Sequence, residues 1–427
     1  MTVLKVDAAK SFNTTIWDIA PDKSISHRAA IFALLSDKSS YIENFLEAED
    51  SLNSLKIVQS LGASVKKESN HLIITPPSKI NEPASILDCG NSGTAMRLLI
   101  GFLAGVDGFF TIHGDKYLAT RPMNRVVDPL REIGANIDGR EKGNLSPISI
   151  RGSSLNSFNY DSKIASAQVK SAMILAALRA NGVSTISEPF KSRDHTEKML
   201  LEMGAKIEID GLKNIVHPMK KPLKPLEIYI GADPSSAFFF ALAAAIVPKS
   251  SVTLKKILLN PTRIEAFEVL KKMGANIEYK NISGEHEIVG DIEVNYSKLK
   301  AVDLETNIAW LIDEIPALAI AFACASGVSR VKNAKELRVK ESDRISATVQ
   351  NLKKCGISCK EYEDGFEVEG GEFKSAQVDS FGDHRIAMSF AIAGLKCGMR
   401  IKDSKCINAS FPNFIDILNR LSSAYED

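Results

Sequence analysis

The sequence predicts an α+β protein assembled from six repeats of about 70 residues. A helical run that ends in a glycine turn and leads into a short apolar strand recurs along the chain, with 72, 70, 70 and 82 residues between successive turn glycines. A second set of helical segments, apolar nearly all round, alternates with the first. Strand-like stretches such as HLIITPP and FFTIHG separate them. Each repeat is therefore expected to contain a strand, a helix, a strand, a helix and one or two further strands.

The first set of helices is amphipathic, and its turn glycines are expected to adopt the left-handed conformation that caps a helix. The runs are SLKIVQSLGASV with Gly62, VVDPLREIGANI with Gly134, TEKMLLEMGAKI with Gly204, AFEVLKKMGANI with Gly274 and ATVQNLKKCGISC with Gly356. A last helix, NFIDILNRLSSA, follows after roughly one more period and has no glycine at its end.

The second set of helices is expected to be buried, because a helix that is apolar all round has no face for water. These helices are SHRAAIFALLS, GTAMRLLIGFLAG, SAQVKSAMILAALRANG, DPSSAFFFALAAAIV, DEIPALAIAFACASG and DHRIAMSFAIAGLKCG. Six such periods account for the full length of 427 residues.

Composition excludes several classes of protein. Lys and Arg number 53 against 52 Asp and Glu, so the net charge of +1 provides no basic surplus for a nucleic acid. Hydrophobic residues make up 44% and charged residues 25%, which is ordinary for a globular protein. The length favours two or three domains.

We expect no membrane-spanning segment, because the longest apolar stretch, Ser236 to Pro248, falls short of the ~20 residues that cross a bilayer. The start, MTVLKVDAAKSF, lacks the apolar region of a secretion signal. The six cysteines include no C-x-x-C pair and are expected to be reduced thiols of a cytoplasmic protein.

The starts of the buried helices carry the functional inference. Ser, Thr and Asp at these starts satisfy free backbone N–H groups, and capping alone explains Asp233 to Ser236. Other starts add cations that capping does not need, namely Lys23, Arg28, Arg97 and Arg385. A helix start prefers anions and an Arg fork binds carboxylate or phosphate with two hydrogen bonds, so several such starts predict a receptor for a small, multiply anionic molecule.

Four local patterns are unusual enough to single out: DKSISHR, LDCGNSGTAMRLL, ELRVKESDRI and FGDHRIAMSFAIAG. Each alone has a structural explanation, as a capped helix, a glycine loop, a solvated charged face or a polar helix tip. Together and in this order, they resemble the 5-enolpyruvylshikimate-3-phosphate synthase family of enolpyruvyl transferases. The resemblance runs from DKSISHR to SFPNF near the end of the chain.

The resemblance implies two similar domains of three repeats each, with the buried helices pointing at the interdomain cleft, an arrangement called an inside-out α/β barrel. The expected domains are residues 14–230, and residues 1–13 with 231–427, so the second is discontinuous.

The resemblance also implies a reaction. The family joins shikimate 3-phosphate to phosphoenolpyruvate and releases phosphate, in the sixth step of chorismate biosynthesis, without metal or organic cofactor. By position in the motifs, Asp313 resembles the base for the 5-hydroxyl group and Glu341 the acid at the enol carbon. Lys23 is expected to contact both substrates and to share in proton transfer.

The family resemblance also implies which residues bind the two substrates. The positions that resemble shikimate 3-phosphate ligands are Lys23, Ser24, Arg28, Ser166, Gln168, Arg193, Asp313 and Lys340. Those that resemble phosphoenolpyruvate ligands are Lys23, Asn91, Gly93, Arg121, Gln168, Arg344 and Arg385. The herbicide glyphosate mimics phosphoenolpyruvate in this family, and tolerant members can carry alanine at the position of Gly93.

Three positions depart from the pattern of well-known members. Ala167 stands where many have a second serine, Ala409 where many have a lysine, and Glu336 where some have asparagine. The segments SAQVKSA, IDEIPALA and ELRVKESDR are closer to the family's other sequence class.

Two alternatives remain. The sibling transferase that acts on UDP-N-acetylglucosamine shares the fold, but it carries Lys-Asn where this chain has Lys23-Ser24, and usually a reactive Cys where KYLATRPMNR has none. A non-catalytic anion-binding regulator could dispense with the acids and bases, all of which are present. The seven histidines show no metal-ligand spacing, so no metal is expected. The expected protein is a monomer whose partners are two small substrates, with no nucleic acid and no membrane.

Overall fold

The computed structural model describes residues 2–284 and 287–426, and the chain divides into two compact units. Unit N comprises residues 21–230, and unit C comprises residues 1–20 together with 231–427. The first crossing falls between Ala20 and Pro21 rather than near Asn13, because strand β2 (Asn13–Ile16) pairs in parallel with β15 (Ser251–Leu258) of unit C.

Among the described residues, the strands form six four-stranded sheets, three in each unit. Each sheet begins with a parallel pair of strands and continues with two antiparallel pairings. The strands of unit N, by sheet, are β14 (Glu227–Tyr229), β3 (Ser40–Glu43), β5 (His71–Thr75) and β4 (Ser64–Glu68); β6 (Leu87–Asp88), β7 (Phe109–His113), β9 (Leu145–Arg151) and β8 (Asn136–Gly139); and β10 (Asn159–Asp161), β11 (Ser184–Ser187), β13 (Lys213–Val216) and β12 (Ile207–Asp210).

Unit C repeats this topology. Its sheets are β2, β15, β17 (Val289–Asn295) and β16 (Asn276–Ser283); β18 (Asp303–Leu304), β19 (Val328–Val331), β21 (Gly365–Glu369) and β20 (Cys359–Tyr362); and β22 (Ala376–Asp379), β23 (Met399–Lys402), β1 (Val3–Val6) and β24 (Ala424–Glu426). Strand β1 lies between β23 and β24, so the first residues of the chain complete the last sheet.

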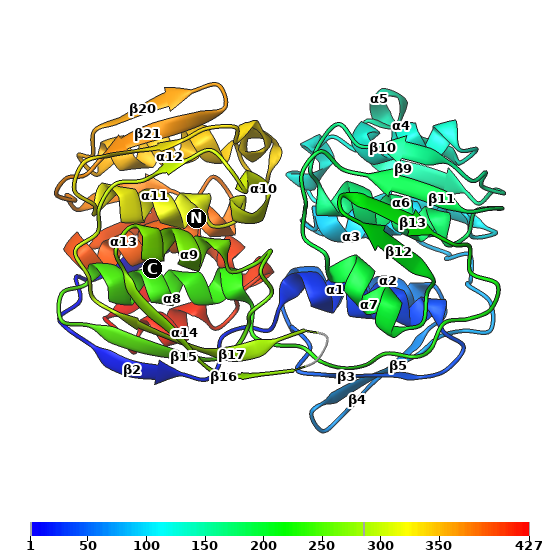
Figure 1. The fold of residues 1–427 in the computed structure, drawn as a ribbon, viewed down its shortest axis with the longest axis horizontal. Helices are drawn as coiled ribbons and strands as arrows, with labels where there is room; N and C mark the ends of the chain where they lie inside the picture. Colours follow the sequence, from blue (N-terminus) through cyan, green and yellow to red (C-terminus); the bar gives the residue numbers. More distant parts are fainter. Residues whose placement is uncertain (1, 285–286, 427) are drawn as a thin grey trace. The chain divides into compact units, whose positions relative to one another are not determined.

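The six apolar helices are buried as predicted. They are α1 (Lys23–Phe32), α3 (Gly93–Leu103), α6 (Ala167–Ala177), α8 (Pro234–Ile246), α11 (Ile315–Ala323) and α13 (His384–Cys397). In unit C, helices α8, α11 and α13 pack against one another inside the sheets, and in unit N helix α3 packs against α1 and α6 (Figure 1). Each unit therefore has a helical core.

The amphipathic helices also fall where the repeat predicts. They are α2 (Glu49–Ser60), α4 (Asn124–Glu132), α7 (His195–Glu202), α9 (Glu265–Lys272), α12 (Arg344–Lys354) and the short α14 (Phe414–Leu418). The five turn glycines that follow the first five have φ between +78° and +102°, which confirms the left-handed caps. Two four-residue helices, α5 (Arg140–Gly143) and α10 (Ile308–Leu311), lie outside the pattern.

Side chains cap five of the six buried helices. Asp22, Ser92, Ser166, Asp233 and Asp383 each accept a hydrogen bond from a backbone N–H of the first turn. Helix α11 is the exception: no side chain caps it, and Pro316 stands in its first turn. No helix in the described part of the chain is long and apolar enough to span a bilayer.

Candidate active site

The start of α1 holds a paired lysine. The Lys23 ammonium lies 2.5 Å from the Asp50 carboxylate, and only 15% and 4% of the two side chains are exposed. Asp50 belongs to the first turn of α2, so this ion pair fixes the lysine at the junction of two helices.

Arg28, one turn further along α1, is 3% exposed and joins three helices. Its Nε donates to the Thr196 hydroxyl of α7 at 2.7 Å, and its Nη2 donates to the Ser171 hydroxyl of α6 at 2.9 Å. Its Nη1 donates to the carbonyl of Ser24 at 3.0 Å, so the structure brings Ser24 and Arg28 together.

His27 lies between these two cations and is fully buried. Its ring nitrogens contact the Ser54 hydroxyl of α2 at 2.8 Å and the Ser92 hydroxyl at the start of α3 at 3.1 Å. Burial, and then the charges of Lys23 and Arg28, hold the pKa of His27 well below its ordinary 6.5. A neutral imidazole therefore ties α1 to α2 and to the start of α3.

The start of α3 brings together three of the residues predicted to bind phosphoenolpyruvate, the donor of the enolpyruvyl group. Arg121 is 5% exposed, and its Nη1 donates to the backbone carbonyl of Asn91 at 3.1 Å. A Cβ atom at Gly93 would lie 2.9 Å from Arg121 Nη2 and 2.8 Å from Arg97 Nη1. Gly93 is therefore what lets two guanidinium groups approach this helix start.

Gln168 in the first turn of α6 connects to the same helix. Its amide donates to the Thr94 hydroxyl at 2.9 Å, and its carbonyl accepts from Arg97 at 2.5 Å. Ser166 caps α6 with a long hydrogen bond of 3.5 Å from the Val169 N–H.

Arg193 lies in the segment between β11 and α7, which is tied down by a buried ion triad. The Lys170 ammonium is 2.8 Å from the Glu188 carboxylate and 2.7 Å from that of Glu197, and all three side chains are at most 4% exposed. Burial alone would lower the pKa of Lys170, but the two carboxylates raise it above its ordinary value. Glu188 also accepts the N–H of Ser192 at 2.9 Å, immediately before Arg193.

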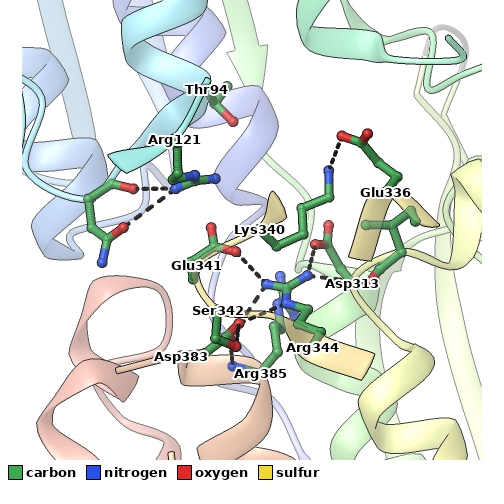
Figure 2. A network of polar contacts seen from close by, with 12 residues as sticks. Thr94, Arg121, Asp313, Glu336, Lys340, Glu341, Ser342, Arg344, Asp383 and Arg385 are labelled. Carbon is green, nitrogen blue, oxygen red and sulfur yellow. Dashed lines mark hydrogen bonds and ion pairs between the residues drawn. The ribbon is translucent and has the colours of Figure 1, made fainter. Parts of the chain in front are cut away.

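Unit C is organised around Arg344, the first residue of α12 (Figure 2). Its side chain is 1% exposed and faces three carboxylates. Nε donates to Asp383 at 2.8 Å, Nη1 to Asp313 at 3.0 Å, and Nη2 to Glu341 at 2.7 Å. Burial alone would lower the pKa of Arg344, but these carboxylates raise it well above its ordinary value.

The structure thus gathers both predicted catalytic carboxylates on one guanidinium. The side chains of Asp313 and Glu341 are 23% and 14% exposed, whereas that of Asp383 is fully buried. Asp383 also caps α13 and accepts from the Ser342 hydroxyl at 3.1 Å. It therefore acts as the inner anchor, and the two outer carboxylates remain accessible.

Lys340 precedes Glu341 and pairs with Glu336 at 3.1 Å. Burial lowers the pKa of Lys340 despite the nearby charges of Glu336 and Asp313, which favour its charged form. Glu336 is a position at which the sequence departs from well-known members. Its carboxylate is the partner of Lys340, a residue predicted to bind shikimate 3-phosphate, the acceptor of the enolpyruvyl group.

Arg385 follows the cap of α13 and is 5% exposed. Its Nε and Nη1 are buried and have no hydrogen-bond partner within residues 2–284 and 287–426. Buried guanidinium donors without protein acceptors are expected to be satisfied by a ligand anion. Of the residues predicted to bind phosphoenolpyruvate, Arg385 is thus the best placed to bind its carboxylate.

Several residues of these clusters cannot be recognised as functional from the sequence alone. Asp50 and Thr196 lie in amphipathic helices and look like ordinary surface positions. Asp383 is visible in the FGDHR motif, but nothing in the sequence indicates that Arg344 is its partner. No group of three or more His, Cys, Asp or Glu among the described residues could hold a metal ion, and His286 lies outside those residues.

Helix starts that carry clustered cations are suited to binding small anions, and two accessible carboxylates on one guanidinium are suited to acid–base chemistry, as in an enzyme that acts on anionic substrates. Comparison with known proteins identifies the family. A family model described as EPSP synthase (3-phosphoshikimate 1-carboxyvinyltransferase) matches residues 6–418. The chain therefore belongs to the EPSP synthase family.

Individual relatives agree over the full length. A protein of a Nitratiruptor species named 3-phosphoshikimate 1-carboxyvinyltransferase is 60% identical over 426 residues, which cover 99% of this chain and 98% of the relative. One of the same name from Sulfurimonas denitrificans is 59% identical, with 99% and 98% covered. A solved structure of EPSP synthase from Acinetobacter baumannii has a TM-score of 0.87 and 36% identity, and covers 100% of both chains.

Proposed function

We propose that this protein transfers the enolpyruvyl group of phosphoenolpyruvate to the 5-hydroxyl of shikimate 3-phosphate and releases phosphate. The observation that carries the proposal is the pair of accessible carboxylates, Asp313 and Glu341, held by Arg344 at 3.0 and 2.7 Å. Membership of the EPSP synthase family supports it.

The reaction needs an acid and a base. The 5-hydroxyl oxygen forms a bond to the carbon of phosphoenolpyruvate that bears the phosphate oxygen and loses its proton, for which Asp313 is the proposed acceptor. Glu341 gives a proton to the methylene carbon, which produces a tetrahedral intermediate. Glu341 then takes a proton back from the methyl group while the carbon–oxygen bond to phosphate breaks, which regenerates the double bond, and the proton held by Asp313 leaves with the phosphate. Each acid or base of this kind typically contributes ~10²- to 10⁴-fold.

The remaining site residues are proposed to bind the two anions. For shikimate 3-phosphate they are Lys23, Ser24, Arg28, Ser166, Gln168, Arg193, Asp313 and Lys340. For phosphoenolpyruvate they are Lys23, Asn91, Gly93, Arg121, Gln168, Arg344 and Arg385. The N–H groups of Arg385 that have no hydrogen-bond partner support the proposal that Arg385 binds the carboxylate of phosphoenolpyruvate.

We also propose the finer features that the family resemblance implies. The buried helices point their starts toward a cleft between the two units, as in an inside-out barrel. The protein is a cytoplasmic monomer that uses no cofactor and is a target of glyphosate.

The direct test is phosphate release by the purified protein with phosphoenolpyruvate and shikimate 3-phosphate, run in parallel with UDP-N-acetylglucosamine as acceptor. We expect release only with the shikimate compound, and its loss in Glu341→Gln. Release only with the UDP-sugar would assign the sibling activity. A folded protein that binds shikimate 3-phosphate but releases no phosphate would be a binding protein.

A further inference from the structure

Arg344 has no hydrogen-bonding capacity left for a ligand. A guanidinium has five N–H donors. Besides the three carboxylate contacts described above, Nη1 donates to the carbonyl of Ile312 at 3.2 Å, and the second N–H of Nη2 reaches Asp383 at 3.5 Å. All five donors are therefore engaged by the protein itself. A phosphoenolpyruvate carboxylate can bind Arg344 only if one of these acceptors leaves.

The acceptors differ in how easily they can leave. Asp383 is fully buried and also caps α13, so its departure would uncap a core helix. The Ile312 carbonyl is backbone. Asp313 has a short side chain and lies just before α11. Glu341 has the longer side chain, is 14% exposed, and lies outside regular structure between Val339 and Arg344.

The geometry at Nη2 also favours Glu341. The other bond of this nitrogen, to Asp383, is the longest of the five at 3.5 Å. When Glu341 leaves, the Nη2 N–H that it occupied is released to an incoming carboxylate, and the second N–H of Nη2 keeps only its long bond to Asp383. Arg385 is held by the same aspartate as Arg344, because its backbone N–H donates to Asp383 at 2.8 Å. Asp383 therefore positions both arginines that are predicted to bind the phosphoenolpyruvate carboxylate.

We propose that Glu341 occupies the donor-carboxylate position on Arg344 in the ligand-free protein, and that phosphoenolpyruvate binds by displacing it. This inference rests on the proposed function and deepens it. Glu341 is then an internal competitor of the donor as well as the proposed acid. The exchange couples the two roles: a carboxylate that leaves a guanidinium loses the interaction that favours its charged form, so donor binding prepares Glu341 to carry a proton.

The proposal predicts that substitution of Glu341, although it removes a proposed catalytic residue, increases the affinity of the protein for phosphoenolpyruvate. A charge-assisted hydrogen bond is roughly twice as strong as a neutral one, so Glu341→Gln competes less well for Arg344. We expect its Kd for phosphoenolpyruvate to fall roughly three- to tenfold below that of the wild type. Glu341→Ala, which removes the competitor altogether, should give at least the same gain.

The measurement is a titration of phosphoenolpyruvate followed by ³¹P NMR, without acceptor, so that no turnover can occur. Glu336→Gln is the matched control, because it removes one carboxylate from the same segment that pairs with Lys340 rather than with Arg344. An equal gain in Glu336→Gln would reduce the effect to general charge and overturn the exchange. Unchanged or weaker binding in both Glu341 variants would also overturn it.

The phosphate-release assay of the wild type separates this inference from the proposed function. If the wild type releases phosphate from both substrates while the Glu341 variants show no gain in affinity, the function stands and the exchange is wrong. Thermal unfolding of each variant verifies that it is folded before its affinity is interpreted.

Discussion

The Nε of Arg344 lies 2.8 Å from the Asp383 carboxylate, and at most 1% of either side chain is exposed. The same carboxylate caps α13, so one aspartate sets both the start of a core helix and the position of the guanidinium that holds Asp313 and Glu341. Unit C has a second pair of this kind, in which Asp233 caps α8 and lies 2.9 Å from the buried Arg263. The two pairs provide a matched comparison between structure and function.

We predict that Asp383→Asn weakens phosphoenolpyruvate binding and lowers turnover. Asparagine is as good a helix cap as aspartate, so the helix start is kept while Arg344 loses its innermost charge. Breaking a buried ion pair costs about 3 kcal/mol, and Asp233→Asn should lose a similar amount of stability. Chemical denaturation and steady-state kinetics of both variants test this. Equal effects of the two substitutions on the KM for phosphoenolpyruvate would show that Asp383 acts only through stability.

We predict that Asp313→Asn loses turnover while it still binds both substrates. The amide keeps the size of the carboxylate and can still accept from Arg344, but it cannot take the proton of the 5-hydroxyl. The expected loss in kcat is ~10²- to 10⁴-fold. Single-turnover kinetics with equilibrium binding of shikimate 3-phosphate would test it. A variant with near-normal kcat would remove Asp313 from the role of base.

Local patterns in the sequence account for much of the fold. The six buried and six amphipathic helices are predictable because 3.6-residue periodicity and a turn glycine are properties of a single segment. The pairing of β1 with β23 and β24 joins the two ends of the chain, and no local pattern encodes it.

The site divides in the same way. Helix starts with excess cations are visible in the sequence because capping does not explain Arg28 or Arg385. The saturation of Arg344 is not visible, because its partners Asp313 and Asp383 are 31 and 39 residues away. Which arginine is satisfied by the protein and which is left for a ligand depends on those long-range contacts.

We predict that Gly93→Ala weakens phosphoenolpyruvate binding more than it affects folding. The new Cβ would meet the ends of Arg97 and Arg121, which are flexible enough to move aside, so the cost in stability is small. The displaced guanidinium groups then no longer meet the donor, and its KM should rise roughly tenfold, as for the loss of one charge-assisted hydrogen bond. The KM for shikimate 3-phosphate is the internal control. A rise in both KM values would indicate a general disturbance of α3.

We predict that His27 makes the protein less stable below neutral pH. Its pKa is well below 6.5 in the native state, so as the pH falls through 6.5 the unfolded chain takes up a proton that the native state does not. His27 therefore costs nothing above this range, and below it the loss is at most about 1.4 kcal/mol per pH unit until the native pKa is reached. Urea denaturation at pH 7.5 and 5.5 should give a smaller difference in unfolding free energy for His27→Gln than for the wild type. His71→Gln is the matched control, because it also removes one histidine, but from a side chain that is half exposed rather than buried.

We predict that the buried triad of Lys170, Glu188 and Glu197 controls acceptor binding through Arg193. Glu188 holds both Lys170 and the Ser192 N–H, so its loss should release the backbone that presents Arg193. Lys170→Met leaves two carboxylates buried without their cation and should cost about 3–5 kcal/mol, whereas Glu188→Gln keeps one ion pair and a hydrogen-bond acceptor. Both variants should raise the KM for shikimate 3-phosphate with little change in that for phosphoenolpyruvate. Arg179→Met is the matched control, because it removes another cation near the end of α6, a partly buried one that stacks on Phe102 instead of pairing with the triad. If Arg179→Met raises the acceptor KM as much as Glu188→Gln does, the triad contributes to stability alone.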